Sequence, residues 1–137
     1  MLLSQYAFYG SSINIYSKVL ALLRPPTYIV GMTAFEFNED LKERCMLLGA
    51  TKAVTTWFKA GVPLIPDEFW ETIVVLPAST HKNIIKIVFS LVKEYMKEFE
   101  DNGFECAVPV LEFSFAQPRI VYAIFPEKNS FTEKELI

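Results

Sequence analysis

The chain has 137 residues, a length typical of a single domain, and 52% of them are hydrophobic whereas 21% are charged. This balance excludes intrinsic disorder, which requires low hydrophobicity and high net charge. The formal net charge of −3 argues against a broadly basic nucleic-acid binder. No run reaches the roughly 18 apolar residues that span a bilayer, and residues 1–23 lack the features of a signal peptide. We therefore expect a soluble, cytoplasmic protein without a membrane partner, in one domain over residues 1–137.

The first elements are a predicted helix and a predicted strand. Residues 11–23 place apolar side chains at helical spacing, and Pro25 and Pro26 then end the helix because proline cannot continue it. Residues 27–37 are rich in β-branched and aromatic side chains, which favour a strand.

A second helix and a second strand follow. Asn38 is a suitable N-cap for a helix over 39–60, which Gly49 interrupts. Residues 67–77 then predict a helical turn that continues into a strand through Val74.

The strongest periodicity in the chain lies in residues 80–101, which predict a long amphipathic helix capped by Ser79 or Thr80. Asn102 and Gly103 form a typical helix stop. One face of this helix is apolar and consists of Ile84, Val88, Leu91, Val92, Tyr95 and Phe99.

The last elements are two predicted strands, residues 104–113 and 119–125. Pro109 removes a ladder hydrogen bond and therefore indicates an edge strand or a bulge. Residues 126–137 are polar and charged and are expected to form a loosely ordered tail. The element order predicts a single α+β domain in which a three- or four-stranded, mostly antiparallel sheet carries the long helix.

The segment from Glu39 to Asp67 resembles a repressor-type helix-turn-helix. The resemblance rests on a glycine at the turn (Gly49), a tryptophan in the second helix (Trp57) and a glycine after it (Gly61). In that motif the first residues of the second helix face the bases of the major groove. The resemblance implies base-facing or phosphate-facing roles for Thr51, Lys52, Thr55 and Lys59. The alternative is that Val54, Trp57 and Phe58 are ordinary core residues.

The chain contains no pattern typical of catalysis, of a metal site or of a cofactor. Zinc sites need four Cys or His ligands at short spacings, whereas this chain offers only Cys45, His81 and Cys106, far apart in sequence. Cysteine chemistry would require His81 to meet one of the cysteines in space. We expect both cysteines to be buried thiols in a reducing compartment, no metal or cofactor, and a function that is not enzymatic.

The surplus of aromatic residues (12 Phe, 6 Tyr and 2 Trp) favours a surface shared with a partner, because aromatic residues are enriched at interface centres. The leading hypothesis is therefore a small protein–protein interaction module that forms a homodimer. Its candidate contact residues are Trp70, Phe113, Phe115 and Tyr122. The alternative is a DNA-binding regulator that uses residues 39–61 as a divergent helix-turn-helix.

Overall fold

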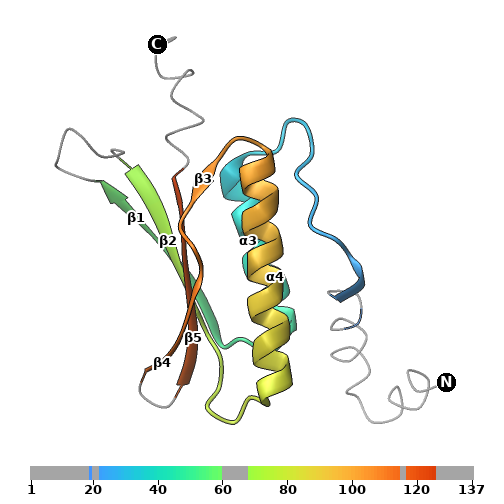
Figure 1. Cartoon of the computed structure of the whole chain (residues 1–137), viewed down its shortest axis with the longest axis vertical. Helices are drawn as coiled ribbons and strands as arrows, with labels where there is room; N and C mark the ends of the chain where they lie inside the picture. Colours follow the sequence, from blue (N-terminus) through green and yellow to red (C-terminus); the bar gives the residue numbers. More distant parts are fainter. Residues whose placement is uncertain (1–18, 20–21, 60–67, 115–116, 126–137) are drawn as a thin grey trace.

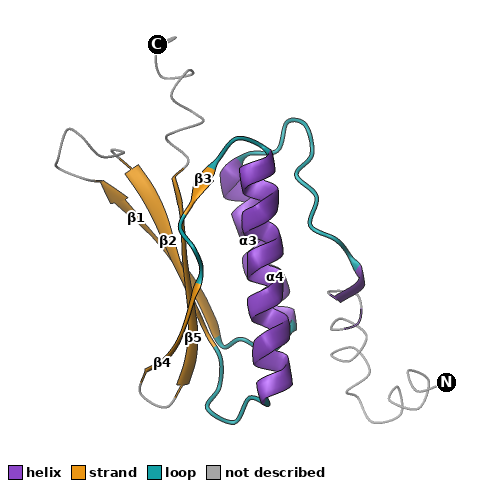
Figure 2. Ribbon diagram, in the orientation of Figure 1, coloured by secondary structure: helices purple, strands orange, loops and turns teal. Residues whose placement is uncertain are grey.

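The structure is a computed structural model, and it describes residue 19 and residues 22–59, 68–114 and 117–125. Figure 1 shows two long helices side by side against one sheet, and Figure 2 shows the same layers by element type. The helices and strands follow the order α3 (Ala34–Leu47), β1 (Lys52–Lys59), β2 (Glu68–Val75), α4 (Lys82–Asp101), β3 (Glu105–Cys106), β4 (Val110–Ser114) and β5 (Gln117–Phe125).

The sheet is antiparallel, with β2 and β5 in its centre and β1 along one edge. The other edge is shared by β3 and β4, which both pair with β5 and are separated by residues 107–109. The single α+β domain and its antiparallel sheet are thus confirmed, although the strands number five rather than three or four. The extra strand results from the break at Pro109, where the sequence predicted an edge strand or a bulge.

The element order repeats once along the chain, since each half consists of a helix followed by two strands or more. The strands β2 and β5, one from each half, lie in the centre of the sheet, and the two halves meet there. Within the described residues, no helix is long and apolar enough to cross a bilayer.

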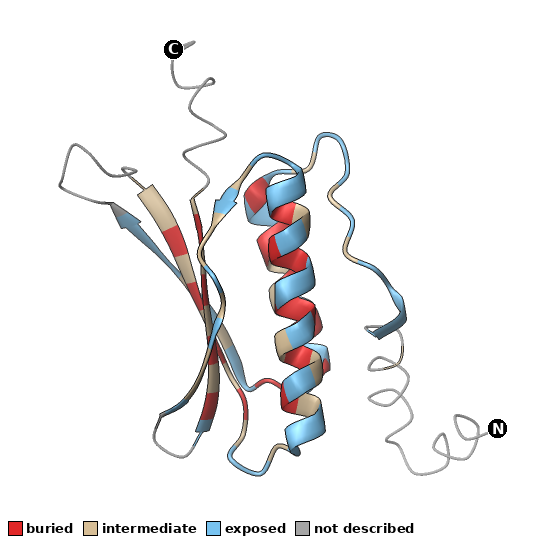
Figure 3. Ribbon diagram, in the orientation of Figure 1, coloured by how far each residue is buried: buried red, intermediate tan, exposed pale blue. Residues whose placement is uncertain are grey.

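Helix α4 confirms the long amphipathic helix of the sequence prediction to within two residues. Its N-cap is His81, whose Nδ1 accepts a hydrogen bond from the backbone N–H of Asn83 (3.0 Å), instead of Ser79 or Thr80. The apolar face of α4 packs onto the sheet, and Figure 3 shows buried residues on one side of the helix with exposed residues on the other.

Helix α3 corrects two predictions, namely the strand over 27–37 and the start of the following helix after an N-cap at Asn38. The helix begins at Ala34 because Thr33 and Glu36 form a capping box, in which each side chain bonds the backbone N–H of the other residue (3.0 and 2.8 Å). Asn38 therefore lies inside the helix and is fully buried.

Strand β1 corrects the second half of the predicted helix over 39–60. Lys52 to Lys59 pair with β2 along their whole length, from Lys52 opposite Val75 to Lys59 opposite Glu68. The segment contains Val54, Thr55 and Thr56 in succession, and β-branched side chains favour a strand over a helix. The predicted second helix of the helix-turn-helix is therefore an edge strand.

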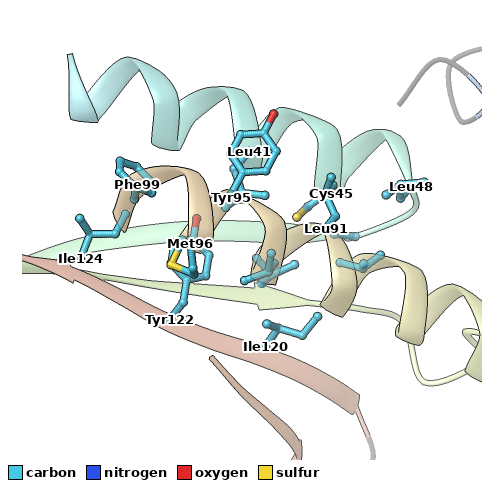
Figure 4. Close-up of a cluster of buried hydrophobic side chains, with 14 of the residues drawn as sticks. Leu41, Cys45, Leu48, Leu91, Tyr95, Met96, Phe99, Ile120, Tyr122 and Ile124 are labelled. Atoms are coloured by element: carbon cyan, nitrogen blue, oxygen red, sulfur yellow. The ribbon is translucent and has the colours of Figure 1, made fainter. Parts of the chain in front are cut away.

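The core lies between the two helices and the sheet, and Figure 4 shows its centre. Phe37 of α3 contacts Tyr95 and Phe99 of α4 at ring-centroid distances of 4.7 and 4.9 Å. Ile120, Tyr122 and Ile124 of β5 cover this cluster from the sheet side.

Strand β2 begins at Glu68, so the helical turn predicted before Val74 is wrong within the described residues. The predicted helix over 11–23 and the tail over 126–137 lie largely or wholly outside the described residues. Of the helix, the structure describes Val19, Leu22 and Leu23, which are helical.

Candidate interaction surface

The helices cover one face of the sheet and leave the other face open (Figures 1 and 3). Alternate residues of each strand point to the two faces. In β2 and β5 the buried residues alternate with half-buried ones, and the half-buried set belongs to the face away from the helices. We call this surface the helix-free face. On the two central strands it consists of Phe69, Glu71, Ile73, Val75, Arg119, Val121, Ala123 and Phe125.

An aromatic row crosses this face near one end. The rings of Phe58 and Phe69 stack at a centroid distance of 5.0 Å, and the ring of Phe69 lies 5.7 Å from that of Phe125. The row thus runs from the edge strand β1 to the central strand β5, and Phe58 retains an exposed fraction of 40%.

An aliphatic row crosses the middle of the same face. The register places Val54 beside Ile73, Ile73 beside Val121, and Val121 beside Val110. Val54 and Val110, at the two edges, are 54% and 50% exposed. Aliphatic side chains that are exposed at the two edges and half-buried in the centre therefore extend across the full width of the sheet.

Charged side chains of the helix-free face lie towards both of its ends, with three at one end and with Glu71 and the β3 residue Glu105 towards the other. Lys52, Val75, Arg119 and Glu112 are neighbours in one row across the strands, and Arg119 forms an ion pair with Glu112 (3.3 Å). Glu71 lies on β2 four residues before Val75, on the far side of Ile73 from the row that contains Arg119. No described residue forms a hydrogen bond or an ion pair with the Glu71 carboxylate.

The size of the helix-free face is sufficient for a protein contact. An eight-residue strand is about 27 Å long and four neighbouring strands are about 19 Å wide, which gives a flat footprint of roughly 500 Å². Antiparallel sheets that leave one face to water normally carry polar residues there. An apolar patch of several hundred Å² on a monomer is often functional, which makes this face a candidate for an interaction.

The predicted contact residues mostly lie elsewhere. Trp70 and Tyr122 belong to the helix-covered face and are only 7% and 1% exposed, so both are core residues. Phe113 is 68% exposed on β4 but points to the helix side of the sheet, because it neighbours buried Pro118. Phe115 lies outside the described residues.

Sequence reasoning missed the residues of the helix-free face, although the sequence carries their signal. In IVYAIF (120–125), both alternating sets of side chains are apolar. The same holds for most of EFWETIVV (68–75). A strand with two apolar sides is expected to be covered on both faces.

The residues assigned to DNA contact are distributed over β1 and the turn before it. Thr51 is exposed, and its hydroxyl donates to the carbonyl oxygen of Val75 (3.2 Å), while Lys52 is exposed at the start of β1. Thr55 points inward to the helices, away from Lys52 and Val54. Lys59 ends β1, and its side chain lies outside the described part. Neither α3 nor α4 carries any of these residues, so no described helix presents them together.

A buried polar cluster joins α3 to three strands on the helix-covered face. The amide nitrogen of Asn38 donates to the hydroxyls of Thr55 (3.1 Å) and Thr72 (3.4 Å), which lie 2.8 Å apart. The amide oxygen of Asn38 accepts from the hydroxyl of Tyr122 (2.6 Å). Burial raises the pKa of Tyr122 well above its ordinary value, so this hydroxyl remains a donor at neutral pH.

A second polar cluster fastens the two helices to each other. The hydroxyl of Tyr95 donates to Asp40 and accepts from the guanidinium of Arg44 (3.0 Å). Asp40 also pairs with Arg24 (3.2 Å), and Arg44 donates to the carbonyl oxygen of Arg24. Burial, followed by the hydrogen bond to Asp40, raises the pKa of Tyr95. Each of these side chains bonds at least one other member of the cluster, so the cluster is explained as a structural link between the helices.

A groove of about 500 Å³ lies between residues 24–32 and α3. Four carboxylates line it, and three of them already stabilise the fold. Glu36 caps α3, Glu39 pairs with Lys42 (2.8 Å) and Asp40 pairs with Arg24. The groove therefore does not bring together free acid and base groups.

The cysteines and His81 do not form a catalytic arrangement. Cys45 is buried between the helices, and burial raises its pKa to about 12, whereas a reactive thiol needs a lowered pKa. Burial also raises the pKa of Cys106 to about 12, and its Sγ lies near the carbonyl oxygen of Met96 (3.9 Å). His81 is at the other end of α4, about 20 Å along the helix axis from Met96. Among the described residues, no group of three His, Cys, Asp or Glu side chains could hold a metal ion.

Comparisons with known proteins give no match, neither to a protein-family model, nor to a curated protein, nor to a solved structure. Any function must therefore be argued from the geometry of the chain, and the helix-free face is its most distinctive surface.

Proposed function

We propose that the protein is a small, non-enzymatic protein–protein interaction module that associates with copies of itself through the helix-free face. The observation that carries the proposal is the row of Val54, Ile73, Val121 and Val110, which is apolar across the whole sheet and not covered by either helix. Burial of such side chains contributes about 25 cal/mol per Å² of apolar surface removed from water.

The expected affinity is modest. Two copies that pack these faces together bury about 1,000 Å² in total by the flat footprint, just below the usual range of stable interfaces. We therefore expect a dimer that forms with a micromolar dissociation constant and separates on dilution.

The experiment is light scattering after gel filtration, over loading concentrations from about 1 μM to about 1 mM. The mass should rise from the 15.7 kDa of one chain towards twice that value. The variant Ile73→Lys places a charge in the centre of the face and should stay monomeric. Its control is Val30→Lys, which makes the same kind of change at an exposed loop position outside the sheet and should still dimerise.

A wild-type mass of one chain at every concentration would contradict the proposal, provided that circular dichroism shows a folded chain. Equal association of wild type and Ile73→Lys would contradict the assignment to this face. Mixed-sequence duplex DNA, added at low salt, tests the DNA-binding alternative. A complex that dissolves at higher salt and is lost in Lys52→Glu would favour it.

A further inference from the structure

The two central strands carry one charge each on the helix-free face, Glu71 on β2 and Arg119 on β5. The other residues of these strands on that face are apolar from Phe69 to Val75 and from Val121 to Phe125. A second copy that covers the face must therefore accommodate both charges.

These two charges cannot neutralise each other within one chain. Glu71 lies opposite Ala123 and Arg119 lies opposite Val75, with the pair Ile73–Val121 midway between them. Four residues along a strand correspond to about 14 Å, too far for an ion pair. Their positions are nevertheless related, because each lies two residues from the Ile73–Val121 pair, in opposite directions.

We propose that a second copy of the chain packs on the helix-free face about a two-fold axis that crosses the strands at right angles through the Ile73–Val121 pair. This proposal rests on the proposed function, because it specifies how the copies of the same assembly are arranged. Rotation about this axis exchanges the two ends of the face and keeps the strands of the two sheets aligned, as in packed β-sandwiches.

The rotation brings opposite charges together. The row of Lys52, Val75 and Arg119 in the second copy lies over the row of Thr56, Glu71 and Ala123 in the first. Glu71 is then flanked by Lys52 and Arg119 of the second copy. Sheets pack about 10 Å apart, a distance that Lys, Arg and Glu side chains reach across. Two-fold symmetry repeats the arrangement, so each of the two clusters combines Glu71 of one copy with Lys52, Arg119 and the Arg119-paired Glu112 of the other, which gives two anions and two cations.

A two-fold axis parallel to the strands gives a less favourable result. It places β2 over β5 of the second copy at the same level, so that Glu71 lies over Ala123 and the two Glu71 carboxylates become neighbours. An ionised carboxylate buried without a cation is strongly unfavourable. The charge pattern therefore favours the axis across the strands.

The test mixes two charge-reversed chains. In a homodimer of Glu71→Arg, the new cation of one copy faces Lys52 and Arg119 of the other. In a homodimer of Arg119→Glu, the new anion of one copy faces Glu71 of the other. Each variant should therefore dimerise at least about 10-fold more weakly than wild type. A mixture of the two variants should form a heterodimer with an affinity within about 3-fold of wild type, because both charge clusters of the mixed pair are complementary.

Native mass spectrometry of the mixture, with one chain carrying a mass tag, measures the heterodimer directly. The matched control is Glu94→Arg, on the exposed side of α4, which reverses the same charge outside the sheet and should leave dimerisation unchanged. Thermal melts of all variants show whether each chain folds, which matters for Arg119→Glu because it also breaks the ion pair with Glu112.

Three results would overturn the proposed arrangement. If Glu71→Arg binds wild type more tightly than it binds Arg119→Glu, the axis runs parallel to the strands, because Glu71 then neighbours itself. If Glu71→Arg and Arg119→Glu each dimerise as tightly as wild type, the two charges do not meet across the interface, and the copies pack in another arrangement or through another surface. If wild type is monomeric, the proposed function fails as well, so the two failures are distinguishable.

Discussion

The two faces of the sheet are both built mainly from apolar side chains, yet the helices cover only one of them. Polar groups distinguish the faces. On the covered face, Thr72 and Tyr122 hold hydrogen bonds to Asn38 of α3, whereas the helix-free face offers charges in place of such partners. If the helices packed on the other face, Asn38 would lose its partners, and a buried unpaired amide costs about 1–3 kcal/mol. Fully satisfied buried polar groups can thus select which of two apolar faces becomes the core.

The largest expected difference between the faces concerns their phenylalanines. Phe37→Ala removes a fully buried ring of the covered side and should lower the free energy of unfolding by about 3–5 kcal/mol. Phe69→Ala, on the helix-free face, should cost less than about half as much in the monomer, because its ring is already partly exposed. Urea denaturation at micromolar protein concentration measures both changes. Equal losses would mean that both faces are equally buried in the single chain.

The pH dependence of stability should come from the covered face. The ordinary pKa of the Cys45 thiol is 9.0 and burial raises it to about 12. Below pH 9 the thiol keeps its proton in both states, and its contribution to stability is complete. Between pH 9 and 12 the unfolded chain loses this proton while the folded chain keeps it, so the free energy of unfolding falls by about 1.4 kcal/mol per pH unit.

From pH 9, where the unfolded thiol is half ionised, to pH 11 the loss due to this thiol should therefore be about 2 kcal/mol. The control is Cys45→Ala, which cannot ionise and should show a shallower slope in urea denaturation at pH 8, 9, 10 and 11. Identical slopes for wild type and Cys45→Ala would show that the thiol is accessible to water. The buried residues of the covered face would then be less well packed than the structure indicates.

Breaking the polar cluster should have an intermediate effect. Asn38→Ala leaves the hydroxyls of Thr72 and Tyr122 with fewer partners in the core and should cost about 2 kcal/mol of unfolding free energy. Glu71→Ala removes a polar group of the helix-free face and should change the monomer by less than about 0.5 kcal/mol. Thermal denaturation of both variants at low concentration provides the comparison. A neutral Asn38→Ala would remove the argument that this cluster selects the covered face.

The smallest expected effect comes from two neighbouring residues of β2. Val74 is fully buried, and Val74→Thr puts a hydroxyl into the core at a cost of roughly 1–2 kcal/mol. Ile73→Thr makes a similar change one residue away on the helix-free face and should cost less than about 0.5 kcal/mol in the monomer, while weakening self-association. Denaturation at two protein concentrations separates the two effects. A larger loss for Ile73→Thr in the monomer would indicate that another part of the chain covers the face.

The sequence was sufficient to predict the elements whose periodicity is simple. Helix α4 has one apolar face and one charged face, so its position and its orientation towards the sheet follow from spacing alone. Strand β5 and, apart from the break at Pro109 that divides it into β3 and β4, the strand over 104–113 followed from their β-branched residues and prolines.

Strand β1 was mispredicted because both faces of the sheet are apolar. Val54, Trp57 and Phe58 recur at helical spacing, yet Trp57 belongs to one face of the strand and the other two belong to the opposite face. A strand with apolar residues on both sides loses the strict two-residue period, and its apolar residues can recur at helical spacing. The run of β-branched residues was the better indicator. The sequence also contained the signal for the start of α3, since Thr33 and Glu36 have the spacing of a capping box, but the prediction did not use it.

The helix-free face was not predicted as the candidate interaction surface because exposure depends on which face the helices cover, and that choice depends on long-range hydrogen bonds. Aromatic content pointed to an interface, but Trp70 and Tyr122 are in the core whereas Phe58 and Phe69 are on the helix-free face. Local sequence does not distinguish these two sets of rings.

The repeated helix-then-strands order also bears on the time course of folding. Each half can form its hairpin from residues close in sequence, whereas the pairing of β2 with β5 must close a loop that contains the whole of α4, β3 and β4. Loop closure costs entropy before its contacts form, and long-range pairings slow folding. We expect the pairing of β2 with β5 to limit the refolding rate. In stopped-flow experiments, Ile120→Val on β5 should slow refolding, whereas Val54→Ala on the edge strand β1 should mainly speed unfolding.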